Sequence, residues 1–249
     1  MIFRQLFEPV SSTYTYLLGC AETGEAVLVD PVMPAWQRDL EAVNDLGLRL
    51  VMTLDTHIHA DHITSASLLR REVGSRIAIP ALDALPCADV GIEDGVPLQF
   101  GGLQLDPVHT PGHTDNHFAI VAGDRVFTGN ALLIDGCGRT DFPGGDAGQL
   151  WDSIQAILAL PPDTRLFVGH DYGAEGRDEP RWEATVAEHR ACNKHVKDGS
   201  DRGEWIRTRQ ARDRTLALPD RMLAALQINL RGGRLPDPEN DDRHYLKLP

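Results

Sequence analysis

The sequence has few cysteines and no long apolar run, and both absences limit what the protein can be. Its 249 residues include four cysteines that lie far apart and form no Cys-x-x-Cys pair. Such a set excludes a disulfide framework and a zinc site built from cysteines. No stretch approaches ~18 uninterrupted apolar residues, and the N-terminal residues lack the order of a signal peptide. We therefore expect a protein of the reducing cytoplasm.

Positive charge is also scarce. Lys and Arg total 24 against 37 Asp and Glu, which gives a formal net charge of -13. That charge repels phosphate backbones and anionic lipid, and no basic patch interleaved with aromatic residues is present, so we expect neither nucleic acid nor a membrane as a partner. The 42% apolar and 24% charged content is that of a globular chain with a substantial core.

Short apolar runs alternate with helical patterns along the whole chain. The expected strands are Ile2–Phe7, Thr13–Leu18, Ala26–Asp30, Leu48–Leu54, Arg76–Ile79, Leu98–Phe100, Leu103–Val108, Phe118–Val121, Arg125–Thr128 and Arg165–Val168. The expected helices are Ala35–Leu46, Ile63–Val73, Leu150–Leu160, Arg181–Val196 and Asp220–Ile228, with a charged connector between the last two. Hairpins and crossovers together favour packed sheets flanked by helices, an α/β (α+β) class. We expect one domain over residues 1–249, with a helical and extended C-terminal segment from about residue 179.

The most informative segment follows the expected strand Leu48–Leu54. It reads Thr56-His57-Ile58-His59-Ala60-Asp61-His62 and places three imidazoles and one carboxylate within six residues. His57 and His59 face the same way on an extended backbone, whereas Asp61 and His62 come where the chain turns toward a helix. This arrangement suits one or two closely spaced metal ions.

Two further histidines are predicted at strand ends. His113 follows the tight turn of Pro111-Gly112, and His170 follows the expected strand Arg165–Val168. The strand Arg125–Thr128 runs through Gly129 into Asn130. The remaining histidines are interpreted as structural; they are His109, His117, His189, His195 and His244. Five histidines at strand ends, three of them in one His-x-His-x-Asp-His segment, predict a metal site.

The ordered set His57-x-His59-x-Asp61-His62, His113, Thr128-Gly129-Asn130 and His170 resembles the ligand motifs of the metallo-β-lactamase superfamily. The resemblance implies an αββα sandwich with the metal at one edge of the two sheets. Within the superfamily, Gly136-Cys137-Gly138-Arg139-Thr140-Asp141-Phe142 and the tail Gln227-Ile228-Asn229-Leu230-Arg231-Gly232-Gly233 are similar to the persulfide dioxygenases. These enzymes oxidise glutathione persulfide with O2 to sulfite and glutathione, and they are commonly homodimers.

The same resemblance implies one Fe(II) per subunit, held by His57, His113 and the residue at position 130. Two histidines and one carboxylate leave open positions for substrate and O2. This sequence departs from the family there, because it has Asn130 where the family has aspartate. A neutral amide oxygen is a weaker donor, so we expect weaker metal binding and impaired activity. Three explanations of Asn130 remain open: an engineered inactivation, a natural variant that recruits another ligand such as His59 or Asp61, or a degenerate protein.

Other roles also follow from the resemblance. Asp61, His62 and His170, which hold a second metal in related hydrolases, would position substrate and water beside a single iron. Arg139 and Tyr172 are candidates for binding the carboxylates of glutathione, although Arg139 has Asp141 and Asp146 as nearby ion-pair partners. Cys137 could serve a redox role but is interpreted as a small buried residue.

Two rival functions remain open. A hydrolase of glutathione thioesters, resembling glyoxalase II, would use two metal ions, but Asn130 would bridge two cations poorly. A catalytically silent protein that binds thiols or persulfides is supported by Asn130 alone. Metal content separates the three: about one iron, about two zinc, or little of either.

Overall fold

The computed structural model describes residues 1–173, 177 and 179–247, and the chain divides into two compact units. The first unit comprises Met1–Ile92, Gln99–Leu103 and Leu218–Pro249, and the second comprises Glu93–Leu98 and Gln104–Ala217. In the described ranges, no helix has the length and apolar character needed to cross a membrane. The expectation of one domain over the whole chain stays a prediction.

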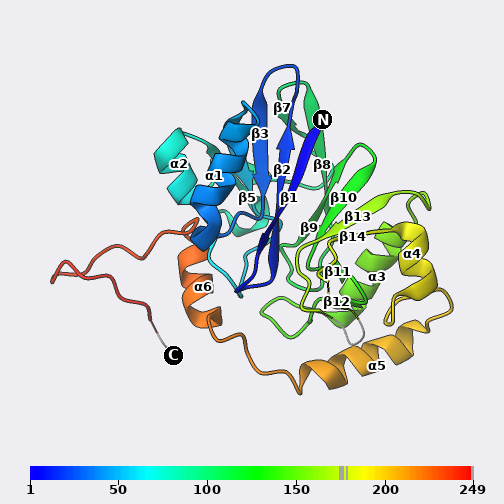
Figure 1. Cartoon of the computed structure of the whole chain (residues 1–249). Helices are drawn as coiled ribbons and strands as arrows, with labels where there is room; N and C mark the ends of the chain where they lie inside the picture. The colour runs from blue at the N-terminus through cyan, green and yellow to red at the C-terminus, as the bar shows by residue number, and fades with distance from the viewer. Residues whose placement is uncertain (174–176, 178, 248–249) are drawn as a thin grey trace. The chain divides into compact units, whose positions relative to one another are not determined.

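The sheet of the first unit has an antiparallel part and a parallel part (Figure 1). Its order is β1-β2-β3-β4-β5-β6; β1 to β3 pair antiparallel, and β3 to β6 pair parallel. The strands are β1 (Ile2–Glu8), β2 (Thr13–Gly19), β3 (Glu25–Val29), β4 (Arg49–Leu54), β5 (Arg76–Pro80) and β6 (Val90–Ile92). β2 is buried throughout, and β3 is buried after its first residue, as central strands require. Parallel strands end at one edge, so the residues after β3 and β4 meet there.

Helices α1 (Trp36–Asp45), α2 (Ala66–Val73) and α6 (Met222–Asn229) belong to the same unit. α1 and α2 pack against β4, and α2 also contacts β5. Along α1, Leu40 and Val43 recur at helical spacing and contact the core formed by strand residues such as Leu28. Burial of each such side chain contributes about 1.5–3 kcal/mol to folding.

The sheet of the second unit is also mixed. Its order is β14-β13-β10-β9-β8-β7; β13 runs parallel to β10, while the β8–β9, β9–β10 and β13–β14 pairs are antiparallel. The strands are β7 (Leu98–Phe100), β8 (Leu103–His109), β9 (Phe118–Ala122), β10 (Arg125–Gly129), β13 (Arg165–Val168) and β14 (Glu183–Thr185). A small hairpin joins β11 (Leu132–Leu133) to β12 (Gly136–Cys137). Because β10 and β13 are parallel, Asn130 and His170 follow their strands at the same edge.

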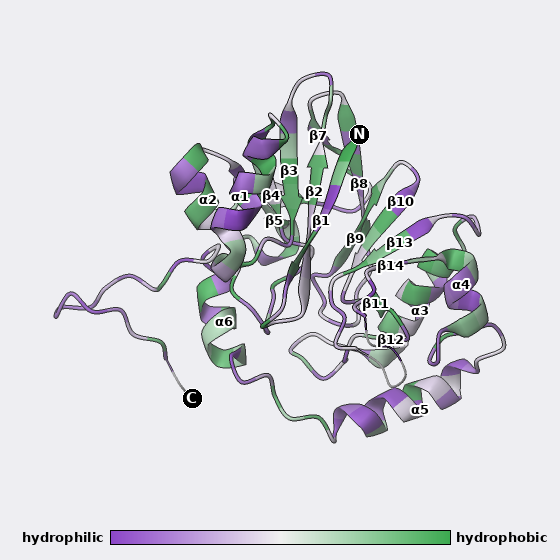
Figure 2. Cartoon of the chain, viewed as in Figure 1, coloured by the Kyte–Doolittle hydropathy of each residue, from purple (hydrophilic) through white to green (hydrophobic). Residues whose placement is uncertain are grey.

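Helices α3 (Ala147–Leu158), α4 (Val186–Cys192) and α5 (Arg202–Asp213) complete the second unit. Asp146 caps α3 by accepting the backbone N–H of Gln149, and Thr185 and Glu188 form a capping box at the start of α4. Apolar residues of α3 belong to a core that also includes Trp205 of α5. Figure 2 shows the contrast between the apolar α3 and the largely hydrophilic α5.

The structure corrects several sequence expectations. The expected helix over Arg181–Val196 begins only at Val186, because Glu183–Thr185 is an edge strand. The charged connector contains α5, and Ile63 belongs to the loop before α2. Most strands and helices lie within a few residues of their expected ranges.

Candidate metal centre

In the first unit, the loop after β4 gathers three imidazoles at the edge where the parallel strands end. His57, His59 and His62 are each 2% exposed or less. The ring centroids of His57 and His59 lie 4.2 Å apart, as do those of His59 and His62. One ligand atom each from His59, Asp61 and His62 can lie within 4.8 Å of one another. Imidazole and carboxylate groups that could hold a metal ion therefore converge in this loop.

Asp30, which follows β3, contacts His59 through the ring nitrogen Nε2. Its Oδ1 lies 3.0 Å from Nε2 of His59, and it accepts the backbone N–H of Thr56 at 2.7 Å. Burial acts to raise the pKa of Asp30, but His59 and the hydrogen bonds from Thr56 outweigh it and lower that pKa. For His59, burial acts to lower the pKa, but chiefly Asp30 raises it to about 9. Nδ1 of His59 is buried without a hydrogen-bond partner among the described residues, so a cation that takes this nitrogen must displace a proton.

Thr56 also orients His57. Its hydroxyl donates to Oδ2 of Asp30 at 2.9 Å and lies 3.0 Å from Nδ1 of His57. A hydroxyl has one proton, so Nδ1 of His57 is the donor in the second contact. The lone pair of His57 then lies on Nε2, the nitrogen available to a metal ion.

Asp55 is a second carboxylate behind the loop, and sequence reasoning missed both it and Asp30. Asp30, Asp55 and His59 can bring one ligand atom each within 4.8 Å of one another. Burial raises the pKa of Asp55 to about 7, and Thr64 donates its hydroxyl to Oδ1 at 3.0 Å. Their place in the sequence could have identified them, because each carboxylate directly follows an apolar strand at the edge that carries the histidines.

In the second unit, His113 and Asn130 are in contact. His113 is 3% exposed, and its Nδ1 donates to the carbonyl of Arg139 at 2.8 Å, since a carbonyl can only accept. Its Nε2 therefore carries the lone pair and accepts the amide Nδ2 of Asn130 at 3.3 Å. Oδ1 of Asn130 is buried and has no hydrogen-bond partner in the part of the chain that the structure describes. A buried amide oxygen of this kind fits a cation.

His117 supports Asn130, a role that sequence reasoning did not assign to it. Nε2 of His117 accepts the backbone N–H of Asn130 at 3.0 Å, and Nδ1 lies 2.8 Å from the hydroxyl of Thr110. His117 is fully buried. Its bonds agree with the interpretation of His117 as a structural histidine.

His170 and Tyr172 follow β13. His170 is 1% exposed, whereas Tyr172 is 66% exposed, and their rings stack with centroids 5.4 Å apart and an interplanar angle of 8°. The aromatic ring of Tyr172 thus covers one face of the His170 imidazole. Its exposed side leaves surface for a ligand.

The guanidinium of Arg139 is already bound within the protein. Nε and Nη2 donate to the two oxygens of Asp141 at 2.6 and 2.7 Å, and Nη1 donates to the carbonyl of Ala217 at 2.8 Å. Of the two ion-pair partners considered from the sequence, Asp141 is the one in contact. Burial raises the pKa of the nearby Cys137 thiol to about 11, which fits its interpretation as a packing residue.

Helix α5 anchors the segment that carries Arg139. Oδ2 of Asp213 accepts the backbone N–H of Thr140 at 2.9 Å and its hydroxyl at 2.8 Å. Asp213 also pairs with Arg209, and both side chains are 5% exposed or less. The Arg139 carbonyl accepts from His113, and the next residue, Thr140, is bound by Asp213 of the buried ion pair. Helix α5 therefore helps to hold the carbonyl that orients the His113 ring.

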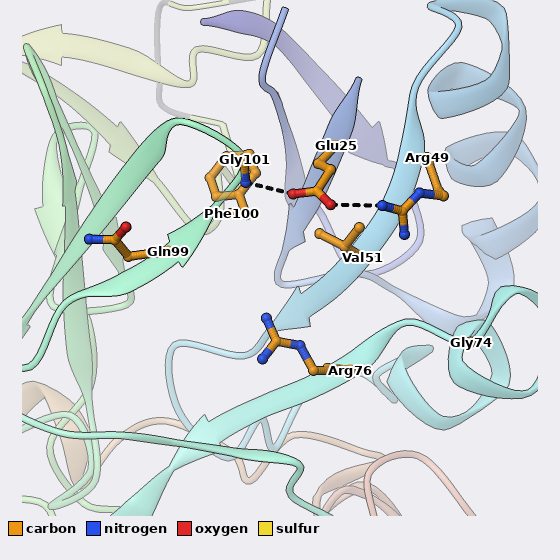
Figure 3. A pocket seen from close by; sticks show the side chains of 8 residues that line it. All are labelled: Glu25, Arg49, Val51, Gly74, Arg76, Gln99, Phe100 and Gly101. Atoms are coloured by element: carbon orange, nitrogen blue, oxygen red, sulfur yellow. Dashed lines mark hydrogen bonds and ion pairs between the residues drawn. The ribbon is translucent and has the colours of Figure 1, made fainter. Parts of the chain in front are cut away.

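A pocket of about 370 Å³ lies at the opposite edge of the first sheet (Figure 3). Glu25, Arg49 and Arg76, the first residues of β3, β4 and β5, contribute to its lining. Glu25 accepts from Arg49 at 2.7 Å and from the backbone N–H of Gly101 at 2.6 Å. These residues lie at the start of the strands, so they do not belong to the histidine loop at the other end.

Comparison with known proteins identifies the family. Residues 9–170 match the metallo-beta-lactamase superfamily. A beta-lactamase hydrolase-like protein of Agrobacterium fabrum is 38% identical over 277 residues, and the match spans 99% of this chain but only 64% of that protein. The mitochondrial persulfide dioxygenase ETHE1 of Homo sapiens is 47% identical over 176 residues, 69% of each protein. The crystal structure of ETHE1 from Myxococcus xanthus matches with a TM-score of 0.87 and 41% identity, over 94% of this chain and 100% of that one. The chain has the metallo-β-lactamase fold and belongs to the persulfide dioxygenase branch of the metallo-β-lactamase superfamily.

Proposed function

We propose that this protein oxidises glutathione persulfide with O2 to sulfite and glutathione, using one Fe(II) per subunit. The observation that carries the proposal is the set of buried donor atoms in both units, above all Nδ1 of His59 and Oδ1 of Asn130, which have no partner among the described residues. The similarity to persulfide dioxygenases supports the choice of reaction.

The proposed iron ligands are His57, His113 and Asn130, with His59 as an additional ligand. This assignment carries the family's ligand positions onto the matching positions of this chain. The hydrogen bonds of Thr56 and of the Arg139 carbonyl leave Nε2 as the ligand nitrogen on His57 and His113. When bound, Fe(II) with open coordination positions would activate O2 for reaction with the persulfide sulfur.

The remaining site residues would position water and protons. The overall reaction takes both oxygens of O2 and one oxygen of water into sulfite, and it releases two protons. We assign the handling of water and protons to Asp61, His62 and His170. Asp61 suits this task because its carboxylate is 21% exposed and lies 3.3 Å from Nδ1 of His62, so it can exchange protons with solvent.

For the glutathione carboxylates we propose Arg139 and Tyr172. The phenol of Tyr172 is exposed and can donate a hydrogen bond to a carboxylate. Arg139 can contribute only by sharing its guanidinium with Asp141, since Nε and Nη2 are bound to that carboxylate. Following the family, we also propose a homodimer, and from the scarce, unpaired cysteines we propose a cytoplasmic location.

The decisive experiment measures O2 consumption after anaerobic loading with Fe(II) and addition of glutathione persulfide. The protein is compared with its Asn130→Asp variant. Consumption by the variant alone would support the proposal and mark Asn130 as an inactivating residue. Consumption by both would support the reaction and show that Asn130 or a substitute ligand is sufficient. If neither form consumes O2, the proposal fails, and hydrolysis of glutathione thioesters becomes the next activity to assay.

One observation favours a second candidate function, a catalytically silent protein that binds thiols or persulfides. The amide of Asn130 donates to the nitrogen of His113 that a metal would need. A protein with this function would contain little iron or zinc after expression with both metals, yet it would bind glutathione. Metal analysis together with calorimetric titration of glutathione separates this candidate from the dioxygenase.

A further inference from the structure

Asn229, the last residue of α6, reaches the histidine loop from the C-terminal end of the chain. Its side chain is 3% exposed. The amide Nδ2 donates to the carbonyl of His59 and to the carbonyl of His62, each at 2.8 Å. The amide Oδ1 accepts the backbone N–H of Thr64 at 3.0 Å. One side chain thus binds three backbone groups of the loop.

We infer that Asn229 is a positioning residue that sets the backbone of the histidine loop, and thereby the direction of its imidazoles. The loop between β4 and α2 is irregular, so its buried backbone groups need partners from elsewhere. An asparagine amide offers two donors and an acceptor on one rigid plane, which matches two carbonyls and one N–H. Aspartate has the same shape but lacks the donors, and alanine lacks all three groups.

The turn that follows Asn229 contacts both the end of the histidine loop and the start of α2. The backbone N–H of Ser67 donates to the carbonyl of Gly232 at 2.8 Å. Gly233 has a φ of 91°, and a Cβ at this position would collide with the carbonyl of Thr64. Glycine is therefore required where this turn meets the loop. Asn229 and Gly233 thus contact the loop itself, and Gly232 binds the first turn of α2 that follows it.

The inference rests on the proposed function only in taking the loop as a metal-binding segment. Metal ligands must be held within about 0.5 Å of their productive positions. Asp30 fixes the ring of His59 through Nε2, and Asn229 fixes its backbone, so the two contacts together leave the ring little freedom. Loss of either contact permits the ligand nitrogen to move.

The test compares Asn229→Asp and Asn229→Ala with Asn193→Ala as a matched control. Asn193 is also buried, and its amide donates to the carbonyls of Leu133 and Gly136 at 3.2 Å, in the second unit. Two quantities are measured: hydrogen exchange at the Thr64 amide in metal-free protein, and Fe(II) affinity by anaerobic competition with a chelator. Both are independent of turnover.

We expect Asn229→Ala to accelerate exchange at Thr64 and to weaken Fe(II) binding by about 10–100-fold. Asn229→Asp keeps an acceptor for Thr64 but no donor for His59 and His62, so it should weaken Fe(II) binding with a smaller effect on exchange. Asn193→Ala should leave both quantities within about threefold of the parent protein, although it removes a comparable number of hydrogen bonds.

Asn229 variants with parental exchange at Thr64 and parental Fe(II) affinity would overturn the inference. Equal weakening of Fe(II) binding by Asn193→Ala would also overturn it, because the effect would then be general destabilisation. If the parent protein binds no Fe(II), the proposed function fails. The exchange measurement then still decides whether Asn229 holds the loop, and Asn229→Asp serves this purpose where Asn229→Ala does not fold.

Discussion

Asn130 donates a hydrogen bond to Nε2 of His113 across 3.3 Å, a bond that an ionised aspartate at the same position could not make. The amide therefore satisfies the imidazole nitrogen that a metal ion would otherwise use. A cation must break this bond and gains no negative charge from residue 130 in return. Asparagine at position 130 thus differs from aspartate in two ways. Its amide is hydrogen-bonded to the ligand nitrogen of His113, and it brings no negative charge to the site.

The first prediction concerns Asn130→Asp. A carboxylate adds a negative charge and does not donate to Nε2 of His113, so Fe(II) affinity should rise by about tenfold or more. Anaerobic competition with a chromogenic chelator measures the change. Asn193→Asp, a substitution of the same type in a buried asparagine outside the site, should not raise the affinity. Equal or weaker binding by Asn130→Asp would show that residue 130 is not a ligand.

The second prediction concerns the buried ion pair of α5. Asp213→Ala leaves the Arg209 guanidinium buried without its carboxylate and removes two hydrogen bonds to Thr140. The free energy of unfolding should fall by roughly 3 kcal/mol, as measured by urea denaturation.

The Arg202–Asp152 ion pair provides the control, because it also involves a residue of α5, paired here with α3, but is exposed, at 50% and 63% for the two side chains. Asp152→Ala should have little effect, since solvent screens that pair. A similar loss in both variants would mean that burial of the Arg209–Asp213 pair does not determine its contribution.

The sequence predicts the histidine clusters because each follows an apolar strand, and the ends of neighbouring strands meet at one edge of a sheet. It does not predict Asn229, whose bond to Thr64 spans 165 residues, or Asp213, whose bond to Thr140 spans 73. Such contacts join a side chain to a distant backbone group and leave no periodic pattern. They become visible only when the fold is known.

Helix α5 illustrates a second reason. Its buried residues are Trp205, Arg209 and Asp213, so two of the three positions that face the core carry charge. Hydrophobic periodicity therefore underestimates its buried face, and the segment resembles a charged connector. The charges are tolerated inside because they pair with each other.

A third prediction concerns Gly112 in the turn before His113. Its φ is 129°, and a Cβ would collide with backbone atoms of Leu150 at the start of α3. Gly112→Ala should lower the free energy of unfolding by roughly 3 kcal/mol or more, because strain and collision act together. Gly123 is the control: its φ is 66°, and no atom lies within 4 Å of a Cβ built there. Gly123→Ala should cost only about 1 kcal/mol. Equal losses in urea denaturation would contradict the collision argument.

The last prediction concerns acid sensitivity through His189 on α4. Burial lowers the pKa of His189 to about 4, from an ordinary value of 6.5. The folded state therefore keeps His189 neutral at pH values where the unfolded state binds a proton. The contribution to stability is fully present above pH 6.5 and is lost as the pH falls from 6.5 toward 4, at roughly 1.4 kcal/mol per pH unit.

His189→Gln removes the titrating group, so the variant should lose less stability than the parent protein between pH 6.5 and pH 5. Urea denaturation of both proteins across this range measures the difference in slope. The window lies above the ordinary carboxyl pKa values, which limits the contribution of acidic groups, and groups common to both proteins cancel in the comparison. Parallel stability curves would mean that His189 is protonated in the folded state at the same pH as in the unfolded chain. Convergence of the curves as the pH falls would assign part of the acid sensitivity to this buried imidazole.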